Sequence, residues 1–234
     1  MSSLANVLAL TAASVGQQLE RVFEDLELVA DEASRLCSHA DTSRGVLEGL
    51  KPVVQGMVDR QGGLVDSAGI SVVPGLLDDA DTWHQWWSLV KGKLLFIPHN
   101  LNPASVNFYD YTDMTWFERP LASGNPELIG PYIDFGGADM KIVTASRPVL
   151  VGAETVAIAG ADLSMEFIER EFLRGLGRRP EHVALLTESG KVVASNSARF
   201  APGTRFEGDG SGSAAVPVAV AGLAAPPWHV ISAK

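Results

Sequence analysis

The sequence is poor in cysteine and in positive charge. Cys37 is its only cysteine, which excludes an internal disulfide and a thiolate metal cluster. Lysine and arginine together number 18 against 28 aspartates and glutamates, so the formal net charge is -10 at pH 7. The basic residues are scattered, apart from Arg174, Arg178 and Arg179, and we therefore expect no nucleic-acid partner.

Long apolar runs and catalytic signatures are also missing. The N-terminus has no basic segment, and Gln17, Gln18, Glu20 and Arg21 interrupt its mildly apolar start too soon for a membrane span. The five histidines show no HExxH or other paired spacing, and neither a GxSxG nor a Walker loop occurs. These absences predict a protein without metal, cofactor or membrane span. Together with the single cysteine, they favour the cytoplasm.

What the sequence does contain is enough apolar material for a core. Its 234 residues are 46% hydrophobic, which suits one large domain or two small ones. From Leu8 to Leu36 apolar residues recur in steps of four and three, which predicts a helix from about Ser3 to His39, roughly 55 Å long. Such a helix either packs against two lobes of its own chain or forms a homodimer, because a sustained heptad pattern is typical of coiled coils.

The remaining pattern indicates two sheet-based lobes. The glycines of "RQGGLVDSAGISVV" predict strand, turn, strand at 60–73, and further strands and a short helix ending at Gly124 suggest an antiparallel sheet with helices on one face. An amphipathic helix at 164–176 and a hairpin around Gly190 repeat the arrangement on a smaller scale. The predicted fold class is therefore α+β, a long N-terminal helix followed by two antiparallel sheets flanked by helices.

Aromatic rings and carboxylates gather between Phe108 and Asp162. Ring faces attract ammonium ions, and a carboxylate in a partly dry pocket adds charge-assisted hydrogen bonds. We therefore expect this region to bind a small cation. The candidate ligand-binding residues are Tyr109, Asp113, Trp116, Phe117, Tyr132, Asp134 and Asp162. Trp83, Trp86 and Trp87 are either the far wall of the same pocket or core and subunit contacts.

The ordered set of Tyr109, "TWF", "GPYID", "TASRPV" and "AIAGADLSMEFIE" resembles the double Cache domain, a PAS-like extracytoplasmic sensor module of bacterial chemoreceptors and histidine kinases. The resemblance covers most of the chain. It implies a long helix and connector at 1–60, a distal-type lobe with the ligand pocket at 61–164, and a smaller proximal-type lobe at 165–234.

The resemblance also implies roles for the candidate residues. In amino-acid-binding members, a tyrosine, an arginine, a tryptophan and a second tyrosine line the helix side of the pocket, and Met114 falls where the arginine should be. The other family positions are matched, in order, by Tyr109, Trp116, Phe117, Tyr132, Asp134 and Asp162, the last being the ammonium-binding aspartate. The carboxylate clamp is therefore missing, whereas the ammonium end is retained.

This asymmetry favours an amine, a quaternary ammonium ion or a polyamine fragment over an amino acid or a carboxylate. A thioether cannot replace the arginine fork, and a buried unpaired charge costs several kcal/mol. Asp113 adds a negative group beside Met114. Simpler interpretations remain: Trp116 and Phe117 as core aromatics, Asp162 as a helix N-cap, and Asp113 as an exposed helix cap.

The leading hypothesis is a non-enzymatic sensor that signals to a separate partner, a regulator or transporter protein. If the chain is the sensory region of a membrane receptor, its location is extracytoplasmic rather than cytoplasmic. A small hydrolase that uses Asp134 and Asp162 as general acid and base is the alternative from another class. A purely structural dimerisation module is the third hypothesis.

Overall fold

The structure is a computed structural model that describes residues 3–39, 42–138, 140–207 and 215–233. The chain divides into two compact units. The terminal unit comprises Met1–Arg21, Gly130–Tyr132 and Met165–Lys234, and the central unit comprises Val22–Ile129 and Ile133–Ser164. No helix among the described residues is long and apolar enough to cross a membrane.

The predicted N-terminal helix is present as α1, Leu4–Cys37. Its residues up to 21 belong to the terminal unit and the later ones to the central unit. The apolar seam is buried within the single chain, each residue being at most 7% exposed: Leu8, Ala12, Val15, Leu19, Val22, Leu26, Val29, Ala33 and Leu36. A homodimer formed through this seam therefore finds no support, because the seam packs against its own chain.

Three short elements connect α1 to the central sheet: α2, Arg44–Leu47, η1, Glu48–Leu50, and α3, Lys51–Gln61. Helix α3 ends at Gly62, whose φ of 58° is the left-handed conformation that glycine adopts without steric cost. The predicted strand, turn, strand at 60–73 is wrong. Residue 69 lies inside a single strand, and it is glycine because a Cβ there would lie 2.0 Å from the carbonyl oxygen of Gln85.

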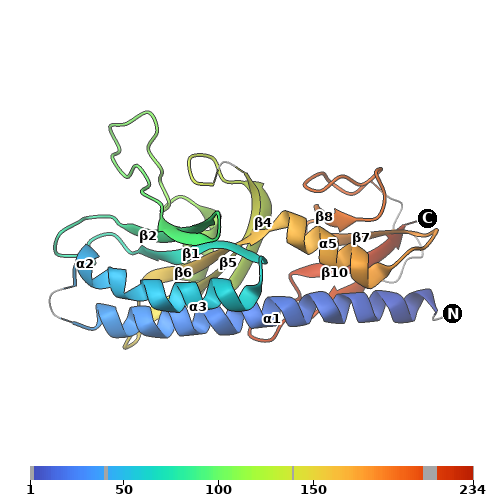
Figure 1. Cartoon of the computed structure of the whole chain (residues 1–234), viewed down its shortest axis with the longest axis horizontal. Helices are drawn as coiled ribbons and strands as arrows, with labels where there is room; N and C mark the ends of the chain where they lie inside the picture. Colours follow the sequence, from blue (N-terminus) through green and yellow to red (C-terminus); the bar gives the residue numbers. More distant parts are fainter. Residues whose placement is uncertain (1–2, 40–41, 139, 208–214, 234) are drawn as a thin grey trace. The chain divides into compact units, whose positions relative to one another are not determined.

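The central sheet has six strands in the order β3-β2-β1-β6-β5-β4 (Figure 1). They are β1, Val65–Val72; β2, His84–Val90; β3, Lys93–Phe96; β4, Glu127–Ile133; β5, Lys141–Val151; and β6, Glu154–Ser164. The pairs β1–β2, β2–β3, β1–β6 and β5–β6 are antiparallel.

Helices cover both faces of this sheet, not one face as expected. On one face, α3 packs on β1, and Arg147 of β5 donates to Glu27 of α1 over 2.8 Å. On the other face lies α4, Thr115–Ser123, which packs on β5 and β6. Because side chains alternate along a strand, every second residue of β1, β2, β5 and β6 faces α4. We call this the α4 face.

The terminal unit holds the second sheet, with strands in the order β8-β7-β10-β9. Its elements are α5, Met165–Leu176; β7, His182–Thr187; β8, Val192–Ser195; β9, Val216–Val218; and β10, Trp228–Ala233. Helix α5 buries the apolar residues Ile168, Phe172 and Leu176, and the expected hairpin turns at Gly190 with φ 77°. The predicted fold class is confirmed: a long N-terminal helix and two antiparallel sheets with helices.

Candidate functional site

The floor of the candidate site is a polar strip on the α4 face. Asp162 of β6 lies in register with Ser67 of β1 on one side and Thr144 of β5 on the other. The Ser67 hydroxyl donates to Asp162 Oδ2 over 2.6 Å, and the Thr144 hydroxyl donates to Oδ1 over 2.8 Å. Asp162 therefore lies within a strand and does not cap α5. Both of its oxygens are held by neutral donors on neighbouring strands.

Burial governs the charge of this carboxyl. Asp162 is 7% exposed, and its burial raises its pKa to about 7, with a further rise from the nearby charge of Asp134. The hydrogen bonds from Ser67, Thr144 and Trp86 act in the opposite direction. In the part of the chain that the structure describes, no lysine, arginine or histidine forms an ion pair with Asp162. The carboxyl group of Asp162 is therefore buried without a cationic partner among the described residues.

Asp134 is a second buried acid, 5% exposed, in the turn that follows β4. The Tyr109 hydroxyl donates to Oδ1 over 3.3 Å, and the backbone N–H of Ala138 donates to Oδ2 over 2.8 Å. Residue 137 has to be glycine here, because a Cβ would lie 1.9 Å from Asp134 Oδ2. The turn thus brings the carboxylate of Asp134 against Tyr109.

Aromatic rings form the wall of the site around His84 of β2. The His84 ring stacks on Trp86 with centroids 4.6 Å apart, and it meets His99 edge-on at 4.5 Å. Tyr109 and Trp116 lie 5.6 and 6.0 Å from it. Burial, with a smaller contribution from the charge of His99, lowers the pKa of His84 well below its usual value. At neutral pH the centre of the wall is therefore an uncharged imidazole.

His84 and His99 were missing from the predicted ligand set, and Trp86 was named only as an alternative for the far wall of the pocket. The sequence signal for His84 and Trp86 was the alternation of His84, Trp86 and Ser88, which puts three residues on one face of a strand. The Ser71 hydroxyl holds His84 Nδ1 at 2.6 Å, and Trp86 Nε1 donates to Ser67 over 2.9 Å. Trp86 therefore links the aromatic wall to the polar floor.

The other predicted ligand-binding residues differ in whether they face the site. Trp116 is buried in α4, 5.9 Å from Trp86, whereas Phe117 turns towards Tyr111 at 5.1 Å and belongs to the core behind the wall. Asp113 is exposed, before an α4 N-cap formed by Met114. Tyr132 is half-buried and is grouped with the terminal unit. Contacts within the central unit thus bring together Tyr109, Trp116, Asp134 and Asp162.

No arginine of the central unit serves this site. Each of the five has an ion pair with an acid elsewhere: Arg35 with Glu32, Arg44 with Asp79, Arg60 with Asp25, Arg119 with Glu127, and Arg147 with Glu27. Met114 is half-buried where the family pattern has its arginine. None of these five arginines therefore neutralises Asp162.

The hydroxyl group of Ser146, in the floor of the site, has no hydrogen-bond partner among the described residues. Ser146 of β5 is opposite Gly160 of β6, two residues from Thr144 and on the same face. It is fully buried. Buried hydroxyls are rarely left unpaired. Among the described residues, no group of three or more His, Cys, Asp or Glu side chains is arranged to hold a metal ion.

Comparisons with known proteins agree with this architecture. Residues 98–170, which include α4 and most of the site, match the family model for the methyl-accepting chemotaxis protein-like, first PDC sensor domain. No curated protein matches the sequence significantly.

Solved structures show the fold of the whole chain. The ligand-binding domain of the Pseudomonas aeruginosa amino acid chemoreceptor PctB in complex with L-Arg is 18% identical, with a TM-score of 0.64 over 99% of this chain and 93% of that one. Methyl-accepting chemotaxis protein X is 16% identical, with a TM-score of 0.65 over 99% and 98%. The extracellular domain of mmHK1S-Z3, described as a histidine kinase, is 13% identical, with a TM-score of 0.69 over 100% and 95%.

The expectation of a cytoplasmic location is wrong. The matching structures are extracellular or ligand-binding domains of chemoreceptors and histidine kinases, and the family model is that of a chemoreceptor sensor domain. These matches contradict the cytoplasmic expectation. The single cysteine did not discriminate between the two locations, because a chain without disulfides is compatible with the cytoplasm and with the extracytoplasmic space.

Proposed function

We propose that this chain is a non-enzymatic sensor domain whose central unit binds a small amine or quaternary ammonium ion between α4 and the sheet. The observation that supports this function is the buried acid Asp162, held by the hydroxyls of Ser67 and Thr144 beside aromatic rings, with the carboxylate of Asp134 bonded to Tyr109 nearby. A buried carboxylate without a cation is unfavourable, and a cationic guest removes that penalty.

The aromatic wall suits the same guest. Trp86, Tyr109 and Trp116 surround His84, and tryptophan and tyrosine faces attract ammonium groups most strongly where water is excluded. The neutral state of His84 leaves this attraction unopposed. The hydroxyl of Ser146 offers a further acceptor for an ammonium N–H.

An amino acid is the second candidate ligand. The related structures include complexes of PctB with L-Arg and of the Pseudomonas fluorescens chemoreceptor CtaA with L-valine, whose ligands carry both an ammonium and a carboxylate group. In this chain the ammonium partners are present, whereas every arginine of the central unit is paired elsewhere. The carboxylate of a zwitterion would thus lack its fork of donors.

As a sensor, the chain transmits occupancy to a partner. A ligand changes the signal only if it binds one conformation better than another. We assign the output to a separate receptor, regulator or transporter component, and no catalytic step to Asp134 and Asp162. Incubation of the purified chain with the ligand tests the hydrolase alternative, because a sensor returns the ligand unchanged.

The ligand class is tested by a thermal-shift screen of ethylamine, choline and putrescine against L-valine, γ-aminobutyrate and acetate. A ligand at 100 times its Kd adds about 2.7 kcal/mol to the free energy of unfolding. We expect the amines to stabilise the chain and Asp162→Asn to abolish the shift. Asp113→Asn is the matched control, because it removes the same charge from an exposed position. Stabilisation by acetate alone would overturn the assignment.

A further inference from the structure

The central unit has a cleft on the side of β2 opposite His84 and Trp86. It encloses about 590 Å³ and is bordered by α2, the start of α3, the turn at Asp79 and the strands β2 and β3. Gln85 and Trp87, which alternate with the residues of the candidate site, point to this side. The cleft is therefore separate from the ammonium site described above.

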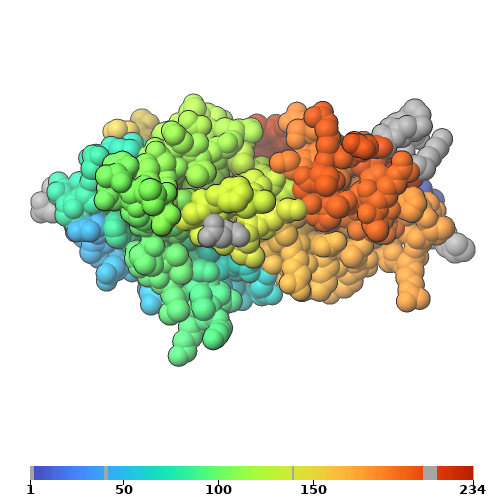
Figure 2. Space-filling view, turned by 90° about the horizontal axis from the view of Figure 1, so that it is seen from above, coloured from blue at the N-terminus to red at the C-terminus, as the bar shows by residue number. Residues whose placement is uncertain are grey.

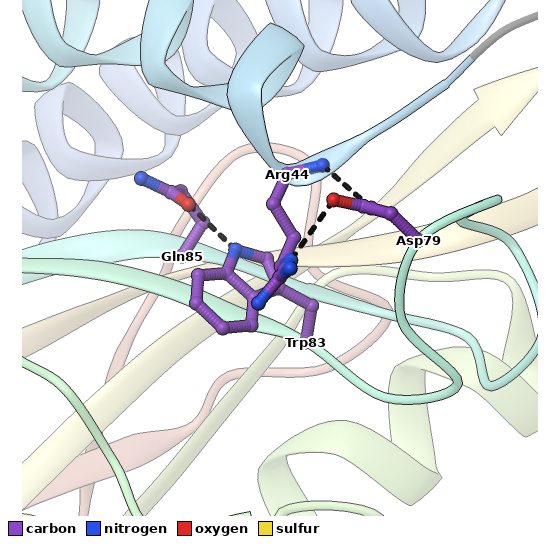
Figure 3. Close-up of polar contacts among 4 residues, drawn as sticks. All are labelled: Arg44, Asp79, Trp83 and Gln85. Atoms are coloured by element: carbon purple, nitrogen blue, oxygen red, sulfur yellow. Dashed lines mark hydrogen bonds and ion pairs between the residues drawn. The ribbon is translucent and has the colours of Figure 1, made fainter.

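A buried amide supplies one donor to the cleft. Trp83 Nε1 donates to Gln85 Oε1 over 2.6 Å, and because an indole nitrogen only donates, this contact fixes which end of the amide is which. The amide nitrogen of Gln85 thus points away from Trp83 (Figure 3). Gln85 is 3% exposed, and within the described residues its nitrogen has no hydrogen-bond partner.

A fixed guanidinium supplies further donors. The backbone N–H and the Nε of Arg44 both bond the carboxylate of Asp79 at 3.0 Å, and the guanidinium carbon lies 5.2 Å from the centroid of the Trp83 ring (Figure 3). Neither Nη group of Arg44 is engaged by a described residue. Their N–H groups are therefore available over the ring face.

Lys51 adds an ammonium group to the lining of the cleft. This lysine is exposed, and in the described part of the chain it has no ion pair. Asp79 is neutralised by Arg44, whereas Glu48 at the rim is exposed and balances the formal charge of Lys51. The donors without a partner among the described residues are the Nη groups of Arg44, the amide nitrogen of Gln85 and the ammonium group of Lys51.

Aromatic rings provide an apolar platform. Trp83 and Phe96 lie nearly parallel with centroids 6.0 Å apart, and Phe96 meets Trp87 edge-on at 6.4 Å. Phe96 is 37% exposed, so part of this platform is in contact with solvent. A planar ring covers such a surface more completely than a branched chain does.

We propose that this cleft binds a small aromatic carboxylate, whose ring lies on Trp83 and Phe96 and whose anionic group accepts from Arg44, Lys51 and the amide of Gln85. Donors with no acceptor of their own define the anionic end, and the exposed rings define the aromatic end. This site is independent of the ammonium site, and each can exist without the other.

Benzoate tests the proposal, with benzyl alcohol and benzylamine as neutral and cationic probes of the same shape. Titrations of the whole chain followed by ¹H–¹⁵N NMR should show saturable benzoate binding that shifts the Trp83 indole N–H. We expect benzyl alcohol and benzylamine to bind at least about tenfold more weakly, since charge-assisted hydrogen bonds discriminate on that scale. Equal binding of the three probes, or no saturable benzoate binding at millimolar concentration, would overturn the proposal.

Two variants locate the site. Gln85→Glu keeps the acceptor for Trp83 and replaces the amide donor by a repelling oxygen, so benzoate affinity should fall by about tenfold or more. Lys51→Gln, at an exposed position that does not endanger the fold, should weaken benzoate binding by a few-fold. Asp31→Asn, at an exposed position of α1, should leave benzoate affinity unchanged. Unaltered benzoate binding in both cleft variants would place the ligand elsewhere and refute the assignment.

Discussion

Two buried acids of the central unit have contrasting surroundings. Asp25 of α1 is 6% exposed and accepts from Arg60 Nε over 2.7 Å and from Gln61 Nε2 over 2.6 Å. Asp162 is 7% exposed and accepts only neutral donors, the hydroxyls of Ser67 and Thr144 and the indole N–H of Trp86. The first acid ties α3 to α1 with a cation of its own chain. The second is held by three donors but has no such cation, and it is here that we propose that a cationic ligand binds.

The largest difference between the two acids should appear in stability above pH 7. Asp162→Asn removes a buried negative charge, so we expect the free energy of unfolding of the ligand-free chain at pH 8 to rise by about 2 to 4 kcal/mol, each pKa unit being worth about 1.4 kcal/mol. Urea denaturation measures the change. A loss of stability would show that the carboxylate of Asp162 is compensated within the chain.

Asp25→Asn should have the opposite sign. It deprives Arg60 of its ion partner, and because that arginine is half exposed, we expect a loss of about 2 kcal/mol rather than the full cost of a buried pair. Asp31→Asn, on the exposed side of the same helix, is the control and should change stability by less than about 0.5 kcal/mol. Equal losses of stability in Asp25→Asn and Asp31→Asn would show that the ion pair of Asp25 with Arg60 does not stabilise the chain.

The pH dependence sharpens the contrast further. The pKa of Asp162 is raised to about 7 in the folded chain, whereas an unfolded aspartate titrates near pH 4. Between these values the folded state holds the extra proton, so stability falls as pH rises through this window and the loss is complete above the folded pKa. The difference between wild type and Asp162→Asn should therefore grow from about pH 4 to pH 7, as urea midpoints at several pH values would reveal. A difference independent of pH would contradict the assignment.

Amine affinity should follow the same titration. A protonated carboxyl has no charge to offer, so the affinity for choline, whose own charge does not change with pH, should increase by about fivefold from pH 6 to pH 7, rise by about another twofold by pH 8 and level off above that. Isothermal titration calorimetry measures this dependence directly. Choline affinity that is flat across the range would mean that Asp162 does not contact the cation.

The smallest expected effect concerns Ser146. Its buried hydroxyl has no partner, so Ser146→Ala should change the stability of the ligand-free chain by less than about 1 kcal/mol. Thr144→Val is the comparison, because it leaves an Asp162 oxygen without its donor and should cost about 1 to 3 kcal/mol above pH 7. A large loss in Ser146→Ala alone would reveal a structural bond at this hydroxyl.

The sequence predicted elements whose signals are local and repeated. The heptad seam of α1 and the hairpin at Gly190 depend on spacing within a few residues, and both are present. Gly69 misled the turn prediction because its reason is a strand 16 residues further along the chain, whose backbone leaves no space for a Cβ.

The site was harder to predict than the fold. Tyr109, Trp116, Asp134 and Asp162 come together by contacts within the central unit, but isolated histidines carry no spacing signal. His99 became visible only once its loop was placed against His84. The segment that follows β3, green in Figure 2, lies on the outer surface of the central unit, where composition says little about contacts beneath.

The turn that carries Asp134 can move when a cation binds between its carboxylate and that of Asp162. Its carboxylate belongs to a loop, whereas that of Asp162 belongs to the strand floor, and the two like charges oppose each other. A single positive charge placed between them reverses the sign of that force and draws the loop towards the strand. Under the proposed function, occupancy of the site is thereby converted into displacement of a short stretch of backbone, a movement that a sensor can transmit.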